Sequence, residues 1–151
     1  MVIRELNGEA SWAFLARHHV GRLACAKAGQ PYVCPISYAT SEDGALYCVT
    51  TMGQKVEWMR ENPLIALEVD EVHTLQQWES VIVTGRFEEI PGTDSARDLR
   101  ERAWSLLQAA NALWWEPGFA ETHLADAAHA RTPLYFRIWT DRITGRHAAV
   151  S

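Results

Sequence analysis

The chain has few cysteines and no metal-binding spacing. Cys25, Cys34 and Cys48 are an odd number, and no two of them form a CxxC pair. Each lies in a segment that we expect to be a strand, so we interpret them as buried free thiols, with a redox or metal role as the alternative. The six histidines form neither HExxH nor any other zinc-ligand spacing, so we expect no metal site.

Long runs of one kind of residue are also missing. The sequence has no Lys/Arg run, and its net charge of -5 with a pI near 5.6 argues against a nucleic-acid-binding or anionic-membrane surface. No apolar run approaches membrane-spanning length, and the N-terminal residues have no apolar signal core. We therefore expect a cytoplasmic protein without nucleic-acid or membrane partners.

The common catalytic motifs are absent as well. The sequence contains no GxSxG motif, no Walker-type loop and no GxGxxG. No side-chain acid, base or nucleophile stands out, so we assign no catalytic residue.

What is present is typical of one globular domain. The 151 residues, 48% of them hydrophobic and 22% charged, predict a single domain over residues 1–151 that is large enough for a real core. Seven tryptophans are many for this length. They indicate aromatic packing or a stacked planar ligand.

Turn and capping signals divide the chain into strands and helices. Asn7 can cap a first helix over residues 8–18, and Thr93 can cap a later helix over residues 95–112. The expected strands cover residues 22–26, 31–39, 46–50, 64–69, 78–90 and 134–140, with a polar connection at 70–77 and a tail after 140. Strands in hairpin succession with helices added predict an α+β, mainly β, sandwich or barrel.

Two residues inside the expected strands have special backbone properties. Pro35 has no N–H for the sheet, which places it at an edge, at a bulge or facing a ligand. Gly85 allows a bend or bulge of the kind that helps a barrel to close.

The segment over residues 46–63 combines a strand, a polar turn and a short helix, which ends before Pro63. Where the strand leads into the helix, the sequence places Thr50, Thr51, Gln54 and Lys55. Free N–H groups and the positive end of the helix dipole face this turn, and the lysine adds a full charge. We therefore predict a phosphate site here. A solvated lysine and threonines that only cap the helix are the alternatives.

The ordered segments VGRLACA, GQPYVCPISYA, LYCVTTMGQKVEWMRENP and WESVIVTGRFEEI resemble the pyridoxamine 5′-phosphate oxidase-like, FMN-binding split-barrel superfamily. The resemblance is to its small flavin-nucleotide-binding subgroup, which includes nitroimidazole-resistance-type reductases. It extends over most of the chain. It implies a six-stranded antiparallel split β-barrel with peripheral helices. It also implies a homodimer that binds FMN in two grooves at the subunit interface.

The resemblance also implies a set of flavin-binding residues. Four residues of the second strand would run along the isoalloxazine ring and give it main-chain contacts: Pro35, Ile36, Ser37 and Tyr38. Val49 and Thr50 would lie beside the ring and ribityl chain, with Thr51 in the adjoining turn. Gln54 and Lys55 would hold the phosphate, with Gln54 where the family often has an arginine. Ser80 would reach the flavin from the position where the family often has a glutamine, and Trp78 would wall the pocket.

These inferences lead to two main hypotheses for function. The first is an FMN-dependent oxidoreductase that acts on a small planar electron acceptor, since the flavin itself carries the redox chemistry. The second is a flavin-binding module without turnover, used for storage, sensing or partner binding. A groove that takes haem or another planar cofactor is a third possibility.

Three further features have open interpretations. The pair Trp114-Trp115 is either a hydrophobic plug or a lid over the flavin, near which His123 and His129 would touch substrate. Arg22 is a candidate for pairing with a carboxylate at the dimer interface, and we expect Glu88-Glu89 to be solvated.

Overall fold

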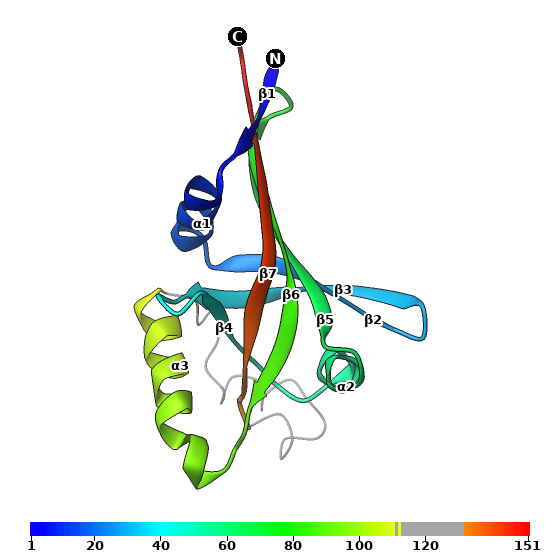
Figure 1. Cartoon of the computed structure of the whole chain (residues 1–151), viewed down its shortest axis with the longest axis vertical. Helices are drawn as coiled ribbons and strands as arrows, with labels where there is room; N and C mark the ends of the chain where they lie inside the picture. The colour runs from blue at the N-terminus through cyan, green and yellow to red at the C-terminus, as the bar shows by residue number, and fades with distance from the viewer. Residues whose placement is uncertain (111, 113–131) are drawn as a thin grey trace, which may run out of the picture.

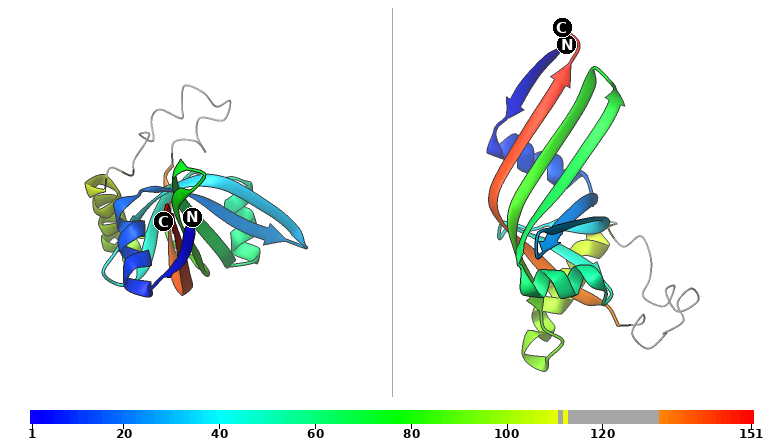
Figure 2. Two further views of the ribbon diagram at one scale, coloured as in Figure 1. Left: turned by 90° about the horizontal axis from the view of Figure 1, so that it is seen from above. Right: turned by 90° about the vertical axis from the view of Figure 1, so that its right-hand side faces the viewer.

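The computed structural model describes residues 1–110, 112 and 132–151. The strands of this part of the chain are β1 (Val2–Leu6), β2 (Val20–Lys27), β3 (Gln30–Thr40), β4 (Ala45–Thr50), β5 (Leu64–Thr74), β6 (Gln77–Ile90) and β7 (Leu134–Ala149). The helices are α1 (Gly8–Arg17), α2 (Gln54–Glu61), the short 3-10 helix η1 (Asp94–Ala96) and α3 (Arg97–Ala109). Figures 1 and 2 show their arrangement.

The strands form one antiparallel sheet that closes on itself. Its order is β1-β7-β4-β3-β2-β5-β6, and β6 also pairs with β7. The strands β2 to β7 therefore form a closed ring of six, which confirms the predicted six-stranded barrel. In Figure 1, β1 lies beside the second half of β7, where the two chain ends meet.

Two glycine-containing positions shape this barrel. The turn between β2 and β3 consists of Ala28 and Gly29, both with positive φ, as a two-residue hairpin turn requires. The pairing of β6 with β7 shifts register between Thr84 and Gly85. The bulge predicted at Gly85 is therefore confirmed.

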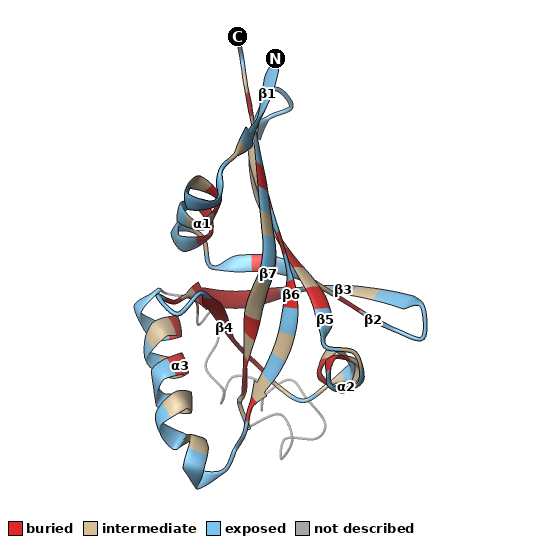
Figure 3. Ribbon diagram, viewed as in Figure 1, coloured by how far each residue is buried: buried red, intermediate tan, exposed pale blue. Residues whose placement is uncertain are grey.

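The core has two parts, one on each side of β4. Leu46 and Cys48 of β4 belong to the first part, which lies inside the barrel beneath α1 and α2. Tyr47 and Val49 belong to the second part, which packs against α3. Because both of its faces are covered, β4 is buried along its whole length (Figure 3).

The structure corrects several predicted boundaries. Residues 70–77 are not a polar connection, since β5 continues to Thr74 and a short hairpin leads directly into β6. The tail after residue 140 does not trail away but continues β7 to Ala149, where it pairs with β1, a strand absent from the sequence prediction. These strand ends carry polar side chains at many positions, which hid them from a search for apolar alternation.

The two predicted helix caps have different outcomes. Asn7 caps α1 as predicted, because its Oδ1 accepts a hydrogen bond of 2.8 Å from the Ala10 N–H. Thr93 makes no capping bond, and its hydroxyl instead contacts that of Ser95 at 2.9 Å. The α-helix accordingly starts two residues later than expected, after η1. No helix among the described residues is both long and apolar enough to cross a membrane.

Candidate functional site

The turn between β4 and α2 has the geometry of an anion site. Gly53 is the N-cap of α2 and makes no side-chain capping bond, so Thr50 and Thr51 do not cap the helix. The first main-chain bond of the helix runs from the Glu57 N–H to the Gly53 carbonyl. The N–H groups before residue 57 therefore have no partner within the helix. These groups and the helix dipole favour a negative charge at the turn.

Lys55 is the cation of this turn. The chain has only two lysines, and Lys27 pairs with Glu61 at 3.0 Å. Lys55 is half-buried, and the ion pairs found within the described part of the chain do not include it. Gln54 beside it is exposed. The turn thus offers one ammonium group that has no carboxylate partner among the described residues.

The β2–β3 hairpin lies above this lysine. Burial raises the pKa of the Cys34 thiol, and the nearby Lys55 ammonium acts in the opposite direction. The pKa of Cys25 is also raised, by burial first and by Cys34 second. Raised thiol pKa values favour the neutral form, so the interpretation as free thiols is consistent with the structure, which has no disulfide among these cysteines. Because the Lys55 ammonium acts on both thiols, it lies close to Cys25 and Cys34, beneath β3.

The first part of β3 has an open edge. Residues 30–37 pair with β2 on one side, whereas β4 pairs with β3 only from Tyr38 to Thr40. Pro35 pairs with Arg22 of β2 on one side and has no paired strand on the other among the described strands. Of the edge, bulge and ligand-facing positions predicted for Pro35, the structure shows the sheet edge. The unpaired main-chain groups of the edge are available to a planar ligand that hydrogen-bonds along a strand.

Ser37 adds a second signal at the same place. Its side chain is 1% exposed, and its hydroxyl has no hydrogen-bond partner among the described residues. Buried hydroxyls are rarely left without a partner in folded proteins. An unsatisfied hydroxyl at the end of the open edge is what a missing polar ligand would leave.

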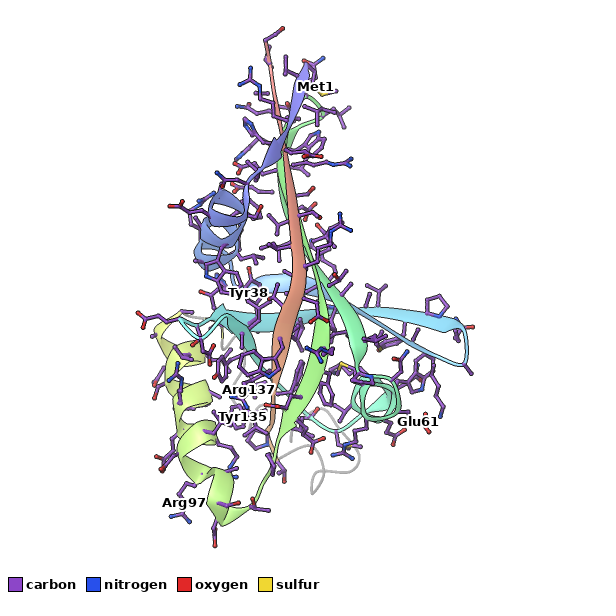
Figure 4. The ribbon with its side chains drawn as sticks, viewed as in Figure 1. Met1, Tyr38, Glu61, Arg97, Tyr135 and Arg137 are labelled. Carbon is purple, nitrogen blue, oxygen red and sulfur yellow. The ribbon has the colours of Figure 1, made fainter. Side chains whose placement is uncertain are left out.

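Two of the residues predicted to give the ring main-chain contacts, Ile36 and Tyr38, have side chains that face the core. The Tyr38 hydroxyl donates to the Leu15 carbonyl at 2.7 Å, and its main-chain N–H donates to the His19 carbonyl. Burial raises the pKa of this phenol far above its usual range. Figure 4 labels Tyr38 near α1. Ile36 is also a core residue, so only the main chain of Ile36 is available to a ligand at this edge.

The end of β4 leads into the turn. Val49 and Thr50 pair with Tyr135 and Leu134 of β7, and both are buried. The Thr50 hydroxyl makes only a long contact of 3.4 Å with the Thr51 carbonyl, so it is weakly engaged. The end of β4 and the start of α2, from Val49 to Lys55, therefore follow directly after the point where β4 stops pairing with β3.

Trp78 and Ser80 do not belong to this cluster within one chain. They lie near the tip of the β5–β6 hairpin, where they pair with Ala148 and Arg146 of β7. Helix α2 is attached to the other end of β6, through Arg60 and Glu89 at 2.6 Å. Ser80 and Glu89 are nine positions apart, roughly 30 Å along an extended strand. In Figure 4, Met1 lies at the end of the molecule near the hairpin tip, well away from Glu61 on α2.

A groove lies beside these two residues. It has a volume of about 760 Å³ and runs along one face of β6 and β7. The side chains of Trp78, Ser80, Ile82 and Thr84 line it from β6, and those of Arg142, Thr144 and Arg146 line it from β7. The sequence interpretation included Trp78 and Ser80 but missed both arginines, because β7 was expected to end before them.

The same sheet face continues over β5, β2 and β3 and is rich in exposed apolar side chains. We call it the outer face, because it points away from the first core. Directly paired residues of antiparallel strands point to the same side, which places six exposed hydrophobic residues on it. They are Ile3, Val20, Val33, Leu64, Val72 and Ile82, each at least 41% exposed. A face with this many exposed apolar side chains is a candidate interaction surface.

Some charges on this face are paired within the chain. Arg22 contacts Asp70 of the same chain at 3.1 Å. Its pairing with a carboxylate at a dimer interface stays a prediction. Glu68 is the residue of β5 that pairs in register with Arg22, and burial, followed by repulsion from Asp70, raises the pKa of its carboxyl. Glu88 is exposed and Glu89 partly exposed, as expected for solvated charges, and each also forms an ion pair: Glu88 with Arg137 at 2.8 Å and Glu89 with Arg60.

Other predicted features can be placed only in part. No group of histidine, cysteine or acidic residues in the described ranges has metal-binding geometry. Trp114, Trp115, His123 and His129 lie outside the described residues.

The fold is a split β-barrel, and the turn after β4 is its candidate anion site. The family model described as pyridoxamine 5′-phosphate oxidase matches residues 7–147, so the chain belongs to this family. An uncharacterized protein of Rhizobium meliloti (strain 1021) is 39% identical over 148 residues, which cover 98% of this chain and 97% of that protein.

Solved structures support the same assignment. A FAD-binding protein from Mesorhizobium loti is 37% identical, with a TM-score of 0.78 and 99% of both chains covered. A 5-nitroimidazole antibiotic resistance protein from Bacteroides thetaiotaomicron has a TM-score of 0.70 at 14% identity, covering 97% of this chain and 89% of that one. The second likeness shows the fold alone.

Proposed function

We propose that this protein binds FMN and acts as an FMN-dependent oxidoreductase on a small planar electron acceptor. The observation that carries the proposal is the Thr50–Lys55 turn next to the open edge of β3. An uncompensated ammonium group and helical N–H groups suit a phosphate, and the strand edge suits the polar rim of a flat ring system. The unsatisfied Ser37 hydroxyl supports the fit of such a group.

The protein residues have binding and positioning roles in this proposal. Lys55 and the first N–H groups of α2 hold the phosphate, while Thr50 and Thr51 line the chain that leads to the ring. Main-chain groups of β3 between Pro35 and Ser37 orient the ring and stabilise negative charge at its polar edge. When bound, the flavin supplies the redox chemistry through its N5 atom. This division of roles explains why no side-chain acid or base is needed.

We further propose that the functional unit is a homodimer with the flavin at the subunit interface. The outer face is an extended apolar surface, and a second copy of the chain is the occupant that fits it. The separation of Trp78 and Ser80 from Lys55 supports this arrangement. If Lys55 and the Trp78–Ser80 pair contact one flavin, they come from two copies of the chain, because the length of β6 keeps them apart within one copy.

A flavin other than FMN is the specific alternative. A related structure at 37% identity is called a FAD-binding protein, and FAD shares the ring and the first phosphate of FMN. A binding module without turnover also remains compatible with the same site. The identity of the cofactor and the presence of turnover therefore need separate measurements.

The test is to purify the protein, record its absorbance spectrum, release the ligand by heat and identify it by mass. FMN is the expected result, FAD would change the assigned nucleotide, and a haem spectrum or a colourless protein that does not take up FMN would refute the proposal. Steady-state oxidation of NADH or NADPH with a nitroaromatic or quinone acceptor then distinguishes an enzyme from a module. A flavinated protein that is inert with every donor would favour the module.

A further inference from the structure

The groove on β6 and β7 holds two arginines that the proposed flavin site does not use. Arg142 and Arg146 are exposed and line the groove on either side of Thr144. The three residues lie on one face of the strand, with about 7 Å between successive positions. Both guanidinium groups are therefore able to approach an anion that lies over Thr144.

These arginines are unusual in a chain with excess acid. The protein has 19 acidic residues and a net charge of -5. Most of its described arginines pair with a carboxylate, among them Arg17, Arg22, Arg60, Arg86, Arg97, Arg102 and Arg137. Arg142 and Arg146 take part in none of these pairs. Glu5 is the cross-strand neighbour of Arg146, yet the two side chains form no such pair.

The rest of the groove suits an aromatic molecule. Trp78 and Ile82 provide apolar surface, and the hydroxyls of Ser80, Thr84 and Thr144 provide hydrogen-bonding groups. The lining exposes more polar than apolar surface, so the groove suits an aromatic molecule that also carries polar or charged groups. A guanidinium matches the two oxygens of a carboxylate and is the preferred partner of such groups.

We propose that Arg142 and Arg146 bind the anionic group of the electron-accepting substrate, so that the substrate class is a planar aromatic carboxylate. The inference rests on the proposed function, because the groove then serves the flavin that the second copy holds. Trp78 packs against the aromatic ring of the substrate, and Ser80 and Thr144 contact its polar groups. Arg146 and Arg142 determine specificity for charge and have no part in the redox step.

The experiment uses the purified holoprotein and two probes of nearly equal shape, 4-nitrobenzoate and neutral 4-nitrobenzamide. Equilibrium dialysis measures binding of each probe to the wild type and to the variants Arg142→Gln and Arg146→Gln. The wild type is expected to bind the carboxylate at least tenfold more tightly than the amide. Each variant is expected to lose most of this preference, with amide binding changed less than twofold.

Arg4→Gln is the matched control. Arg4 is also exposed, but it pairs in register with His147 and so lies on the opposite face of the sheet from Arg146. This variant is expected to keep the full preference for the carboxylate. Equal loss in all three variants would mean a general effect of net charge and would overturn the proposal.

Flavin content and molecular mass are recorded on the same samples. Equal binding of the two probes by a flavin-loaded wild type would overturn this inference and leave the proposed function intact. The Arg142 and Arg146 variants could instead keep the preference for the carboxylate and lose the flavin or the dimer. That result would also overturn the inference, since the arginines would then serve the cofactor or the interface. A wild type without flavin would instead count against the proposed function.

Discussion

Gly85 of β6 packs directly against the carbonyl oxygen of Trp139 on β7, and a β-carbon at position 85 would overlap that oxygen. This contact lies at the bulge where the sheet bends to close the barrel. The absence of a side chain at residue 85 is therefore a requirement of the closure between β6 and β7.

Gly85→Ala is predicted to destabilise the protein by at least about 3 kcal/mol, because backbone must move to make room for the methyl group. Urea unfolding measures the change. Gly92→Ala is the control, since a β-carbon there meets no atom within 4 Å. An unfolding midpoint for Gly85→Ala equal to that of the control would show that the bulge accommodates a side chain.

The turn before β4 depends on the charge of Asp43. The Tyr47 hydroxyl donates to Asp43 Oδ2 at 2.6 Å, and the Ala45 N–H donates to Oδ1 at 2.9 Å. Burial alone would raise the pKa of this carboxyl, but these hydrogen bonds, with Ser41 and Arg102, lower it below its usual value. A lowered native pKa means that the charged form stabilises the folded state.

Asp43→Ala is predicted to cost about 1–3 kcal/mol at pH 7, because it leaves the buried end of Tyr47 without its acceptor. The contribution of the charge is present above the unfolded pKa of roughly 4 and is lost as pH falls through the lower native pKa. The difference between wild type and variant should therefore shrink between about pH 5 and pH 3, as measured by denaturant unfolding at several pH values. A constant difference over that range would contradict the role of the charge.

The outer face gives a direct test of the proposed dimer. Val33 is 63% exposed on this face, so Val33→Glu should leave the monomer fold unchanged but place a charge in the interface. We expect the dimer dissociation constant to rise about 100-fold or more, as seen by light scattering across a dilution series. Leu75→Glu is the control, because Leu75 is 91% exposed at the hairpin tip. A Val33→Glu dimer as stable as the control would place the interface elsewhere.

Much of the barrel could be predicted from the sequence, because its central strands alternate between core and surface. Val81, Val83 and Gly85 share the buried face of β6 as their spacing indicates. The outer ends of β5 and β7 could not be predicted in the same way, since residues such as Asp70 and Arg146 leave no apolar stripe. Their pairing depends on neighbouring strands that lie far away in the sequence.

The candidate site shows the same division. Thr50 and Lys55 are close in sequence, so a local pattern was enough to place them in one turn. Trp78 and Ser80 came only from the resemblance, and their distance from Lys55 in one chain depends on the length of β6. The engagement of Tyr38 with Leu15 and His19 depends on how α1 packs, which no local pattern records.

Gln54 offers a gain of function at the phosphate turn. It is exposed at the start of α2, so Gln54→Arg should fold normally and add a second cation beside Lys55. We expect affinity for FMN to rise about three- to tenfold and to become more dependent on salt, with no change for riboflavin, which has no phosphate. Fluorescence titration of flavin into apoprotein measures both ligands. An equal rise for riboflavin would show that the new side chain contacts another part of the flavin.

The central claim is that the Lys55 ammonium holds the phosphate of a flavin nucleotide. The most direct test compares the dissociation constants of FMN and riboflavin for wild-type apoprotein and for Lys55→Ala. Loss of one charged contact to phosphate should weaken FMN binding about tenfold or more and leave riboflavin binding within about twofold. Unchanged FMN affinity, or an equal loss for both ligands, would contradict the account.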